Sequence, residues 1–260
     1  MQSLKSTLKS FGLGVSQPLP NESQCPECGY FDLSHPDVQR ILRANGWDDQ
    51  RMVIAGCRCH MREEAQKARD ALRHQQANLP HPSEPRTFDT FKARPGTEAA
   101  TLACRQFVER QSPKCLCLVG EPGCGKSHLL EAIGRALLYR GRSVRYEFVP
   151  TLIDRLRHSH NDDSKQDVAD LMAWYGRMDT LLLDDVGAER MTLFGVEKLT
   201  ELVDARLREE RWLVIVTNHK REELAERVGP RLASRMFQDN PDLGEMKVVP
   251  VAATDYRHQA

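Results

Sequence analysis

The stretch G-E-P-G-C-G-K-S at residues 120–127 decides the fold of this chain. It matches the pattern G-x-x-x-x-G-K-[ST] of phosphate-binding loops. The apolar run C-L-C-L-V before it predicts a buried strand, and apolar residues at helical spacing after it predict a helix that ends at Gly141. In such a unit the glycines let backbone N–H groups face a phosphate, and the helix N-terminus adds partial positive charge. The sequence therefore predicts an α/β fold that binds a nucleoside triphosphate.

Two side chains at the end of the loop have defined chemical roles. Lys126 is placed to reach the β- and γ-phosphates, and the Ser127 hydroxyl is placed to ligate Mg²⁺. ATP and Mg²⁺ are thus the predicted cofactors. The predicted nucleotide-binding residues are Gly120, Glu121, Pro122, Gly123, Cys124, Gly125, Lys126 and Ser127.

Two further strand-end motifs complete a hydrolytic pattern. The run T-L-L-L-D-D-V-G at residues 180–187 places Asp184 to hold the magnesium shell and Asp185 to orient or deprotonate the attacking water. Alone, an apolar run before two aspartates also fits a strand followed by a turn. A third apolar run, residues 212–216, leads to Asn218, which would hydrogen-bond the γ-phosphate or the water, or else would open a turn. Together with the loop, these motifs predict an ATPase.

The composition limits the location and the partners of the chain. Lys and Arg number 37 and Asp and Glu number 37, so no global basic field indicates nucleic-acid binding, and any such contact must be local. No apolar run is long enough to cross a bilayer, so we expect no membrane contact and a cytosolic (cytoplasmic) protein with reduced cysteines. Four cysteines near the loop are expected to be small buried residues: Cys104, Cys115, Cys117 and Cys124.

The other four cysteines form two close pairs near the N-terminus. Cys25 with Cys28 and Cys57 with Cys59 could share one tetrahedral Zn²⁺, with His60 as an alternative to Cys59. Unliganded thiols or a redox pair are the alternatives. We expect a zinc-binding adaptor module over residues 1–79 that ends in a charged helix over 61–76. A Pro-rich linker over 80–90 and an ATPase core over 91–260 follow.

At this point the motifs support a resemblance to a known family. G-E-P-G-C-G-K-S, L-L-L-D-D-V-G-A-E-R, V-I-V-T-N, R-L-A-S-R-M-F and the terminal D-Y-R resemble the AAA+ ATPases of the DnaC and DnaI helicase-loader group, to which the transposition helper IstB also belongs. The resemblance covers roughly residues 86–257. It implies a five-stranded parallel sheet in the order 5-1-4-3-2, with helices on both faces. About 25 residues follow Arg235, too few for the helical lid of full AAA+ proteins, and the terminal D-Y-R matches the ending of this group, so we expect a core without a C-terminal lid.

The resemblance also implies an arginine finger that acts on the ATP of a neighbouring subunit, and hence a homo-oligomer. Arg235 matches this position, and Arg231 is its local competitor. A solvated helix charge is the alternative for Arg235.

A helix is expected after the second strand, starting at a capping box formed by Thr151 and Asp154. Its apolar residues would face the core and leave Arg155 and Arg157 exposed. In helicase loaders this region contacts single-stranded DNA, so these arginines are the candidate nucleic-acid ligands. A solvated helix face is the alternative.

We therefore expect an ATP-dependent helicase loader that binds single-stranded DNA and a replicative DNA helicase. The alternative within the same family is an IstB-like helper that recruits a transposase to DNA. From a different class, an adaptor that binds ATP without appreciable turnover is opposed by the complete set of Lys126, Asp184 and Asp185.

Overall fold

The computed structural model describes residues 40, 43, 58–110, 114–161, 168–237 and 246–256. The chain divides into two units, residues 1–71 and 72–260. The division falls within helix α4 (Arg58–Ala77), which corresponds to the predicted charged helix. Cys25, Cys28 and Cys57 lie outside the described residues, and the side chains of Cys59 and His60 are not described either. The zinc hypothesis therefore stays a prediction.

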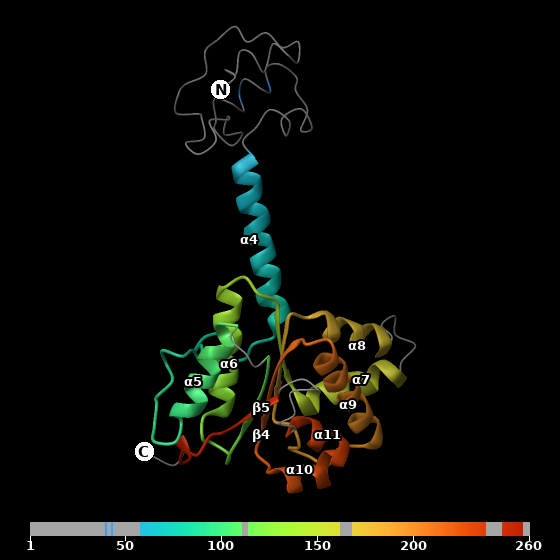
Figure 1. Cartoon of the computed structure of the whole chain (residues 1–260). Coiled ribbons are helices and arrows are strands. Elements are labelled where there is room, and N and C mark those ends of the chain that lie inside the picture. The colour runs from blue at the N-terminus through green and yellow to red at the C-terminus, as the bar shows by residue number, and fades with distance from the viewer. Residues whose placement is uncertain are drawn as a thin grey trace. The chain divides into compact units, whose positions relative to one another are not determined.

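The second unit is built on a sheet of five parallel strands (Figure 1). The strands are β1 (Cys115–Val119), β2 (Val144–Phe148), β3 (Thr180–Asp184), β4 (Trp212–Thr217) and β5 (Met246–Pro250). Their spatial order is β2-β3-β4-β1-β5, which confirms the predicted order. The strand of the phosphate-binding loop thus lies between β4 and β5, so the three motif-bearing strands are neighbours.

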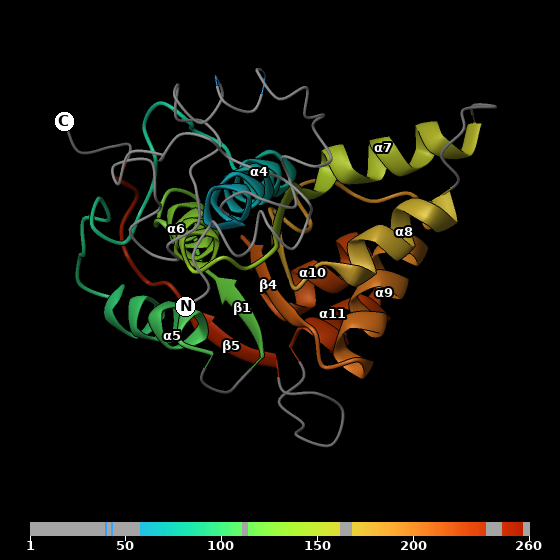
Figure 2. The same ribbon diagram turned by 90° about the horizontal axis from the view of Figure 1, so that it is seen from above.

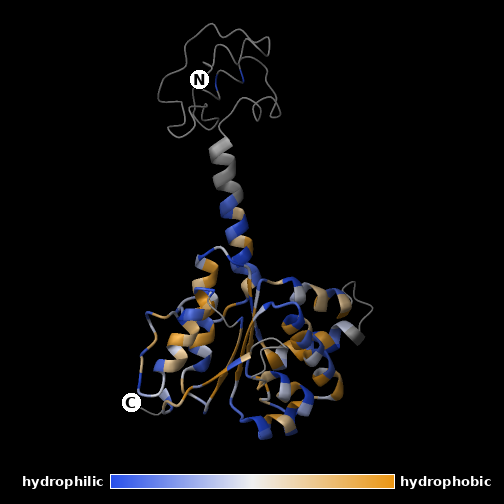
Figure 3. Cartoon of the chain, viewed as in Figure 1, coloured by the Kyte–Doolittle hydropathy of each residue, from blue (hydrophilic) through white to orange (hydrophobic). Residues whose placement is uncertain are grey.

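Helices cover both faces of this sheet (Figure 2). One core cluster packs α5 (Glu98–Val108) and α6 (Lys126–Tyr139), with Ala77 at the end of α4, on the sheet, and the other packs five further helices. These are α7 (Val149–Asn161), α8 (Val168–Arg177), α9 (Leu193–Arg208), α10 (Arg221–Val228) and α11 (Pro230–Met236). In β3, Leu182 belongs to the first cluster, whereas Leu181 and Leu183 belong to the second. This alternation explains the continuous apolar strands (Figure 3), because both faces are buried.

Two glycines set the ends of the loop helix. Gly125 at the N-cap of α6 has a φ of 99°, and Gly141 beyond its C-terminus has a φ of 71°. The N–H of Arg142 donates to the carbonyl of Leu137 at 3.0 Å, which closes the last turn of the helix. The predicted stop at Gly141 is thereby confirmed.

Helix α7 begins earlier than predicted. It starts at Val149, directly after β2, and carries Pro150 in its first turn, where proline is well tolerated. Thr151 therefore lies inside the helix, and the predicted capping box is wrong. The predicted apolar face is confirmed, since Leu152, Ile153 and Leu156 are buried.

The four cysteines of the second unit are buried and free, as predicted. Burial raises the pKa of the Cys104 and Cys117 thiols to about 12 and that of Cys115 to about 11. These thiols are therefore protonated and act as small apolar side chains.

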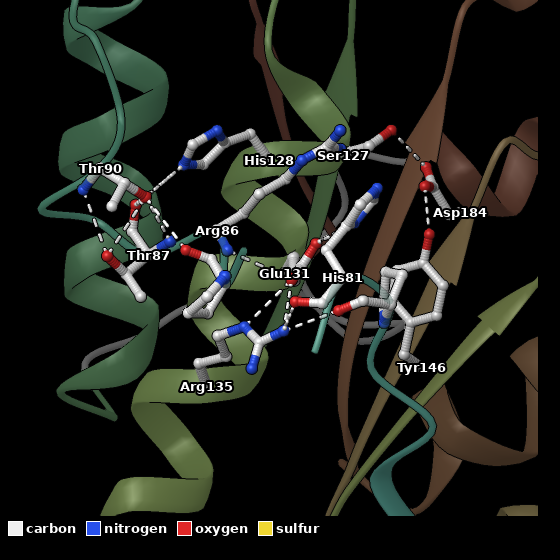
Figure 4. A network of polar contacts seen from close by, with 12 residues as sticks. His81, Arg86, Thr87, Thr90, Ser127, His128, Glu131, Arg135, Tyr146 and Asp184 are labelled. Carbon is white, nitrogen blue, oxygen red and sulfur yellow. Dashed lines mark hydrogen bonds and ion pairs between the residues drawn. The ribbon is translucent and has the colours of Figure 1, made fainter. Parts of the chain in front are cut away.

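The segment predicted as a linker lies against α6 (Figure 4). Its anchor is Glu131, a carboxylate with no exposed surface. His81 Nδ1 lies 3.0 Å from one oxygen of Glu131, and the backbone N–H of Arg86 donates to the other at 3.3 Å. Arg135 pairs with the same carboxylate and also donates to the carbonyl of Pro80 at 2.7 Å. Residues 80–86 are thus fastened to the helix that follows the phosphate-binding loop.

Candidate nucleotide-binding site

The phosphate-binding loop requires glycine at two positions. Gly123 has a φ of 77°, and a Cβ atom there would lie 1.9 Å from Oδ1 of Asp255. Gly125 has a φ of 99°, and a Cβ atom there would lie 2.9 Å from the ring of Phe91. The positive φ disfavours other residues at both positions, and at Gly125 the ring of Phe91 also leaves no room for a side chain.

Lys126 lies in the loop with only 4% of its surface exposed. Its Nζ donates to the carbonyl oxygens of Gly120 at 2.8 Å and Glu121 at 2.7 Å. Within the described residues, no carboxylate forms an ion pair with this ammonium. A buried cation held by uncharged groups favours an anion beside it, so the loop fits a phosphate.

Ser127 and Asp184, the two predicted magnesium ligands, lie together. The Ser127 hydroxyl donates to Oδ1 of Asp184 at 3.1 Å, and the Tyr146 hydroxyl donates to Oδ2 at 2.6 Å (Figure 4). Burial raises the pKa of Asp184, and the charge of Asp185 adds to that shift. Burial likewise raises the pKa of Tyr146, so its hydroxyl keeps its proton. The adjacent hydroxyl and carboxylate oxygens are ligands that Mg²⁺ prefers.

Asp185 and Asn218 form the second pair of the site. Asp185 has a φ of 60°, a left-handed conformation that is uncommon for residues other than glycine, although aspartate adopts it more readily than most. The Asn218 amide Nδ2 donates to Oδ1 of Asp185 at 2.8 Å. The backbone around them is fixed because the Val186 N–H donates to the carbonyl of Val216 at 2.9 Å. This strained aspartate is thus held by the strand next to its own, which is typical of a functional residue.

A pocket of about 520 Å³ opens beside the loop. The predicted residues that line it are Pro122, Gly123, Gly125, Lys126, Ser127 and Asn218. Sequence reasoning did not assign the remaining lining residues, which are Arg86, Thr90, Phe91, Lys92, His128 and Tyr256. Three of them, Arg86, Thr90 and Phe91, lie in the motif R-T-F-D-T-F at residues 86–91, and Tyr256 lies in the terminal D-Y-R; Lys92 and His128 lie in no motif that the sequence analysis quoted.

The end of the described chain reaches this pocket. The Tyr256 N–H donates to the carbonyl of Gly123 at 3.0 Å, and its hydroxyl donates to the carbonyl of Lys92. The guanidinium of Arg94 lies 3.8 Å from the centre of the Tyr256 ring. The motif D-Y-R therefore belongs to the site through its tyrosine, whereas Arg257 lies outside the described residues.

Arg235 lies in α11 and is not one of the residues that line the pocket of its own chain. Its Nε lies 2.8 Å from Oδ1 of Asp204, and Nη2 of Arg231 donates to Oδ2 at 2.8 Å. The candidate finger therefore does not line the nucleotide pocket of its own chain.

The two candidate DNA-binding arginines differ in their surroundings. Arg157 is exposed and pairs with Asp154 at 2.7 Å. Arg155 is only partly exposed, because its Nη1 donates to buried Glu147 at 2.6 Å and to the Tyr175 hydroxyl. The expectation that Arg155 is exposed on the helix surface is therefore wrong, because its guanidinium forms an ion pair with the buried carboxylate of Glu147.

The fold and the site together define a P-loop nucleotide-binding protein of the α/β class. The family model described as "IstB-like ATP binding protein" matches residues 57–260. This chain belongs to that family, and the resemblance to the AAA+ ATPases of the DnaC, DnaI and IstB group is confirmed.

Similar proteins include replication factors. The replicative helicase loader DnaC of Escherichia coli (strain K12) is 26% identical over 157 residues, covering 59% of this chain and 64% of that protein. The chain thus matches somewhat less than two thirds of that relative. A crystal structure of the DnaC helicase loader superposes with a TM-score of 0.54 at 25% identity, covering 63% of this chain and 96% of that one. A crystal structure of DnaI has a TM-score of 0.54 at 22% identity, covering 70% and 98%, and supports the fold alone.

Proposed function

We propose that this protein is an ATP-hydrolysing switch that loads a replicative helicase onto single-stranded DNA. One observation carries the hydrolytic part of the proposal: Ser127 with Asp184, and Asp185 with Asn218, meet at the carboxyl ends of β1, β3 and β4. Ligands of open α/β sheets bind at this edge.

The residues of the site have separable tasks. The loop amides and Lys126 would bind the phosphates, and Ser127 and Asp184 would hold Mg²⁺, whose charge would offset the charge that develops on the phosphate oxygens. Asp185 accepts a hydrogen bond from the attacking water and orients it. Asn218 donates to Asp185 and so fixes the direction of that carboxylate.

The test of hydrolysis is Asp185→Ala. We expect turnover to fall about 10²- to 10⁴-fold, the usual contribution of a general base, while ATP still binds. Asp170→Ala, an exposed aspartate of α8, is the matched control and is expected to keep wild-type turnover. An Asp185→Ala protein as active as the wild type would reject the hydrolytic mechanism and favour an adaptor that only binds ATP.

The helicase part of the proposal is supported by the similarity to DnaC, which is named as a replicative helicase loader. We propose that residues 1–79 form a zinc-bound adaptor for the helicase through Cys25, Cys28, Cys57 and Cys59 or His60, with residues 80–90 linking it to the ATPase core at 91–260. Pull-down with the host replicative helicase, using the full chain and a chain without residues 1–80, tests this. Failure of the full chain to bind any helicase would count against loading, and metal analysis without stoichiometric zinc would reject the zinc module.

A second candidate function is supported by the family model itself, whose description names IstB. In that case the same ATPase core would deliver a transposase to DNA. Binding of the full chain to a transposase encoded beside it, without binding to a helicase, would favour this function over helicase loading.

Single-stranded DNA binding is proposed to use the exposed Arg157, with Arg155 at the edge of the contact. Arg157→Ala is expected to weaken binding and to reduce its dependence on salt by about one ion, because one phosphate contact is lost. Arg221→Ala, an exposed arginine on α10, is the control. An unchanged salt dependence would assign Arg157 to a solvated helix face.

A further inference from the structure

One carboxylate, that of Asp204 in α9, holds two arginines of α11. Arg235 Nε lies 2.8 Å from one oxygen, and Arg231 Nη2 donates to the other at 2.8 Å. Only 11% of the Asp204 side chain is exposed, compared with 31% for Arg235 and 74% for Arg231. The three charged groups thus form a partly buried cluster at the contact of α9 with α11.

Apolar contacts attach α11 to the protein beside the charged cluster. Leu232, Ala233 and Met236 are buried beneath the helix and join the core cluster that also contains the apolar residues of α9. This apolar contact stabilises the docking of the helix, whereas ion pairs with an exposed partner contribute little. The position of the carboxylate therefore calls for another explanation.

The geometry favours orientation of Arg235 over neutralisation of its charge. Oδ1 of Asp204 lies 2.8 Å from Nε of Arg235, an ion-pair contact that limits where the guanidinium can lie, although the two atoms are not aligned for a hydrogen bond. Since Arg231 shares the same carboxylate, the single charge of Asp204 is divided between two arginines. A guanidinium whose place is restricted by an ion pair within its own chain is suited to meet a phosphate presented by another molecule.

We propose that Asp204 is the positioning residue of the arginine finger: it orients Arg235 toward the γ-phosphate bound by a neighbouring subunit. This inference rests on the proposed ATPase function and on Arg235 as the finger. Helix α9 also begins after the loop that follows Asp185, with Thr192 as its N-cap. Helix α9, which follows the nucleotide site of one subunit, would thus orient the arginine finger that acts on the ATP of the neighbouring subunit.

The test mixes two variant chains, so that one subunit supplies only the arginine finger and its neighbour supplies only the ATP site. A Lys126→Ala chain keeps its finger but lacks the phosphate-binding lysine, and an Arg235→Ala chain keeps its own site but lacks the finger. Together they are expected to recover turnover. Adding Asp204→Asn to the Lys126→Ala chain should reduce the recovered kcat by about 10-fold or more, because a misplaced catalytic group loses rate steeply. Adding Asp204→Asn to the Arg235→Ala chain should leave the recovered kcat unchanged.

Several readouts distinguish positioning from a general structural defect. The KM for ATP should stay constant while kcat falls, and Asp204→Glu should restore part of the rate. Arg231→Ala in the finger-donating chain is the matched control and should complement normally. Urea unfolding of Asp204→Asn reports whether the variant is folded.

Three outcomes would overturn the inference. They are an equal loss when Asp204→Asn is placed in either chain, an increase in KM with kcat unchanged, and loss of complementation by Arg231→Ala instead. No recovery in the parent mixture, with an active wild type, would reject the arginine finger itself and this inference with it. An inactive wild type would reject the proposed function first.

Discussion

At the scale of single residues, the site is organised around a buried carboxylate. Asp184 is 5% exposed and accepts hydrogen bonds from Ser127 and Tyr146. Burial raises the pKa of Asp184, so keeping it ionised costs folding free energy at neutral pH. That cost is offset when a divalent cation binds beside it. Function and stability therefore oppose each other at this position.

The Tyr146 hydroxyl is predicted to orient Asp184 for magnesium. Tyr146→Phe removes a hydrogen bond to a charged group, worth about 1.5–3 kcal/mol, and should lower Mg²⁺-dependent turnover about 10- to 100-fold. A magnesium titration of the ATPase measures this effect. Tyr139→Phe is the matched control because that side chain is 93% exposed. Equal activity of the two variants would show that Ser127 alone suffices to orient the carboxylate.

Replacing Asp184 by asparagine is expected to abolish turnover yet stabilise the metal-free protein at neutral pH, by about 1 kcal/mol. Asp184→Asn is expected to raise the free energy of unfolding because the pKa of Asp184 is higher in the folded protein than in the unfolded chain. The cost of the ionised group is therefore removed as the pH falls through the raised pKa. Urea unfolding in EDTA should show the advantage of Asp184→Asn shrinking from neutral pH toward about 4, the ordinary pKa of aspartate. A constant advantage would exclude titration of Asp184 as its cause.

At the scale of elements, one buried arginine joins three segments. Arg206 of α9 has no exposed surface, and its guanidinium donates to backbone carbonyls at the end of α8, in the turn before β3 and in β4. The carbonyls are those of Tyr175, Gly176, Met178, Asp179 and Trp212. Burial lowers the pKa of Arg206 to about 10, so it stays charged at neutral pH. The helix is thereby tied to the start of the strand that carries Asp184.

Arg206→Ala is predicted to destabilise the protein by about 3 kcal/mol or more, because several buried carbonyls lose their donor. The free energy of unfolding in urea measures the loss. Arg208→Ala removes an exposed arginine from the same helix and should cost no more than about 0.5 kcal/mol. Similar losses of stability for the two variants would contradict the inference that the hydrogen bonds from Arg206 to backbone carbonyls stabilise the protein.

The elements themselves were predictable from local patterns. Glycines, strand-end aspartates and apolar periodicity identified the loop, β1, β3, β4 and α6, since each of these signals lies within a few neighbouring residues. Contacts between segments distant in the sequence were not predictable. Tyr146 lies on a strand without any site motif, and nothing near Asp204 in the sequence marks it as the partner of Arg235.

Two errors have the same physical origin. Thr151 and Asp154 satisfy the local pattern of a capping box, but the chain turns directly from β2 into α7 and takes up helix two residues before Thr151. Arg155 has the spacing of an exposed residue, yet Glu147 is buried within reach of it. A tertiary contact overrides the local pattern at Arg155, and the direct connection of β2 to α7 overrides it at Thr151.

At the scale of the whole molecule, the second unit contains both core clusters and all five strands. The buried residues of both clusters lie between Ala77 and Ala253, within residues 72–260. We therefore predict that residues 72–260 fold alone and bind ATP. Saturation at 100 times Kd should stabilise this fragment by about 2.7 kcal/mol, as it does the full chain. Thermal unfolding with and without Mg-ATP measures this, and a fragment that unfolds without cooperativity would contradict it.

The position of β1 in the sheet has a consequence for biosynthesis. Cys115 pairs with Leu213 on one side and with Met246 on the other, so the strand that leads into the phosphate-binding loop has both of its partners far downstream. During translation, this apolar strand leaves the ribosome long before either partner has been made. The nucleotide site therefore matures late, and ATP cannot stabilise the nascent chain until β4 and β5 have emerged.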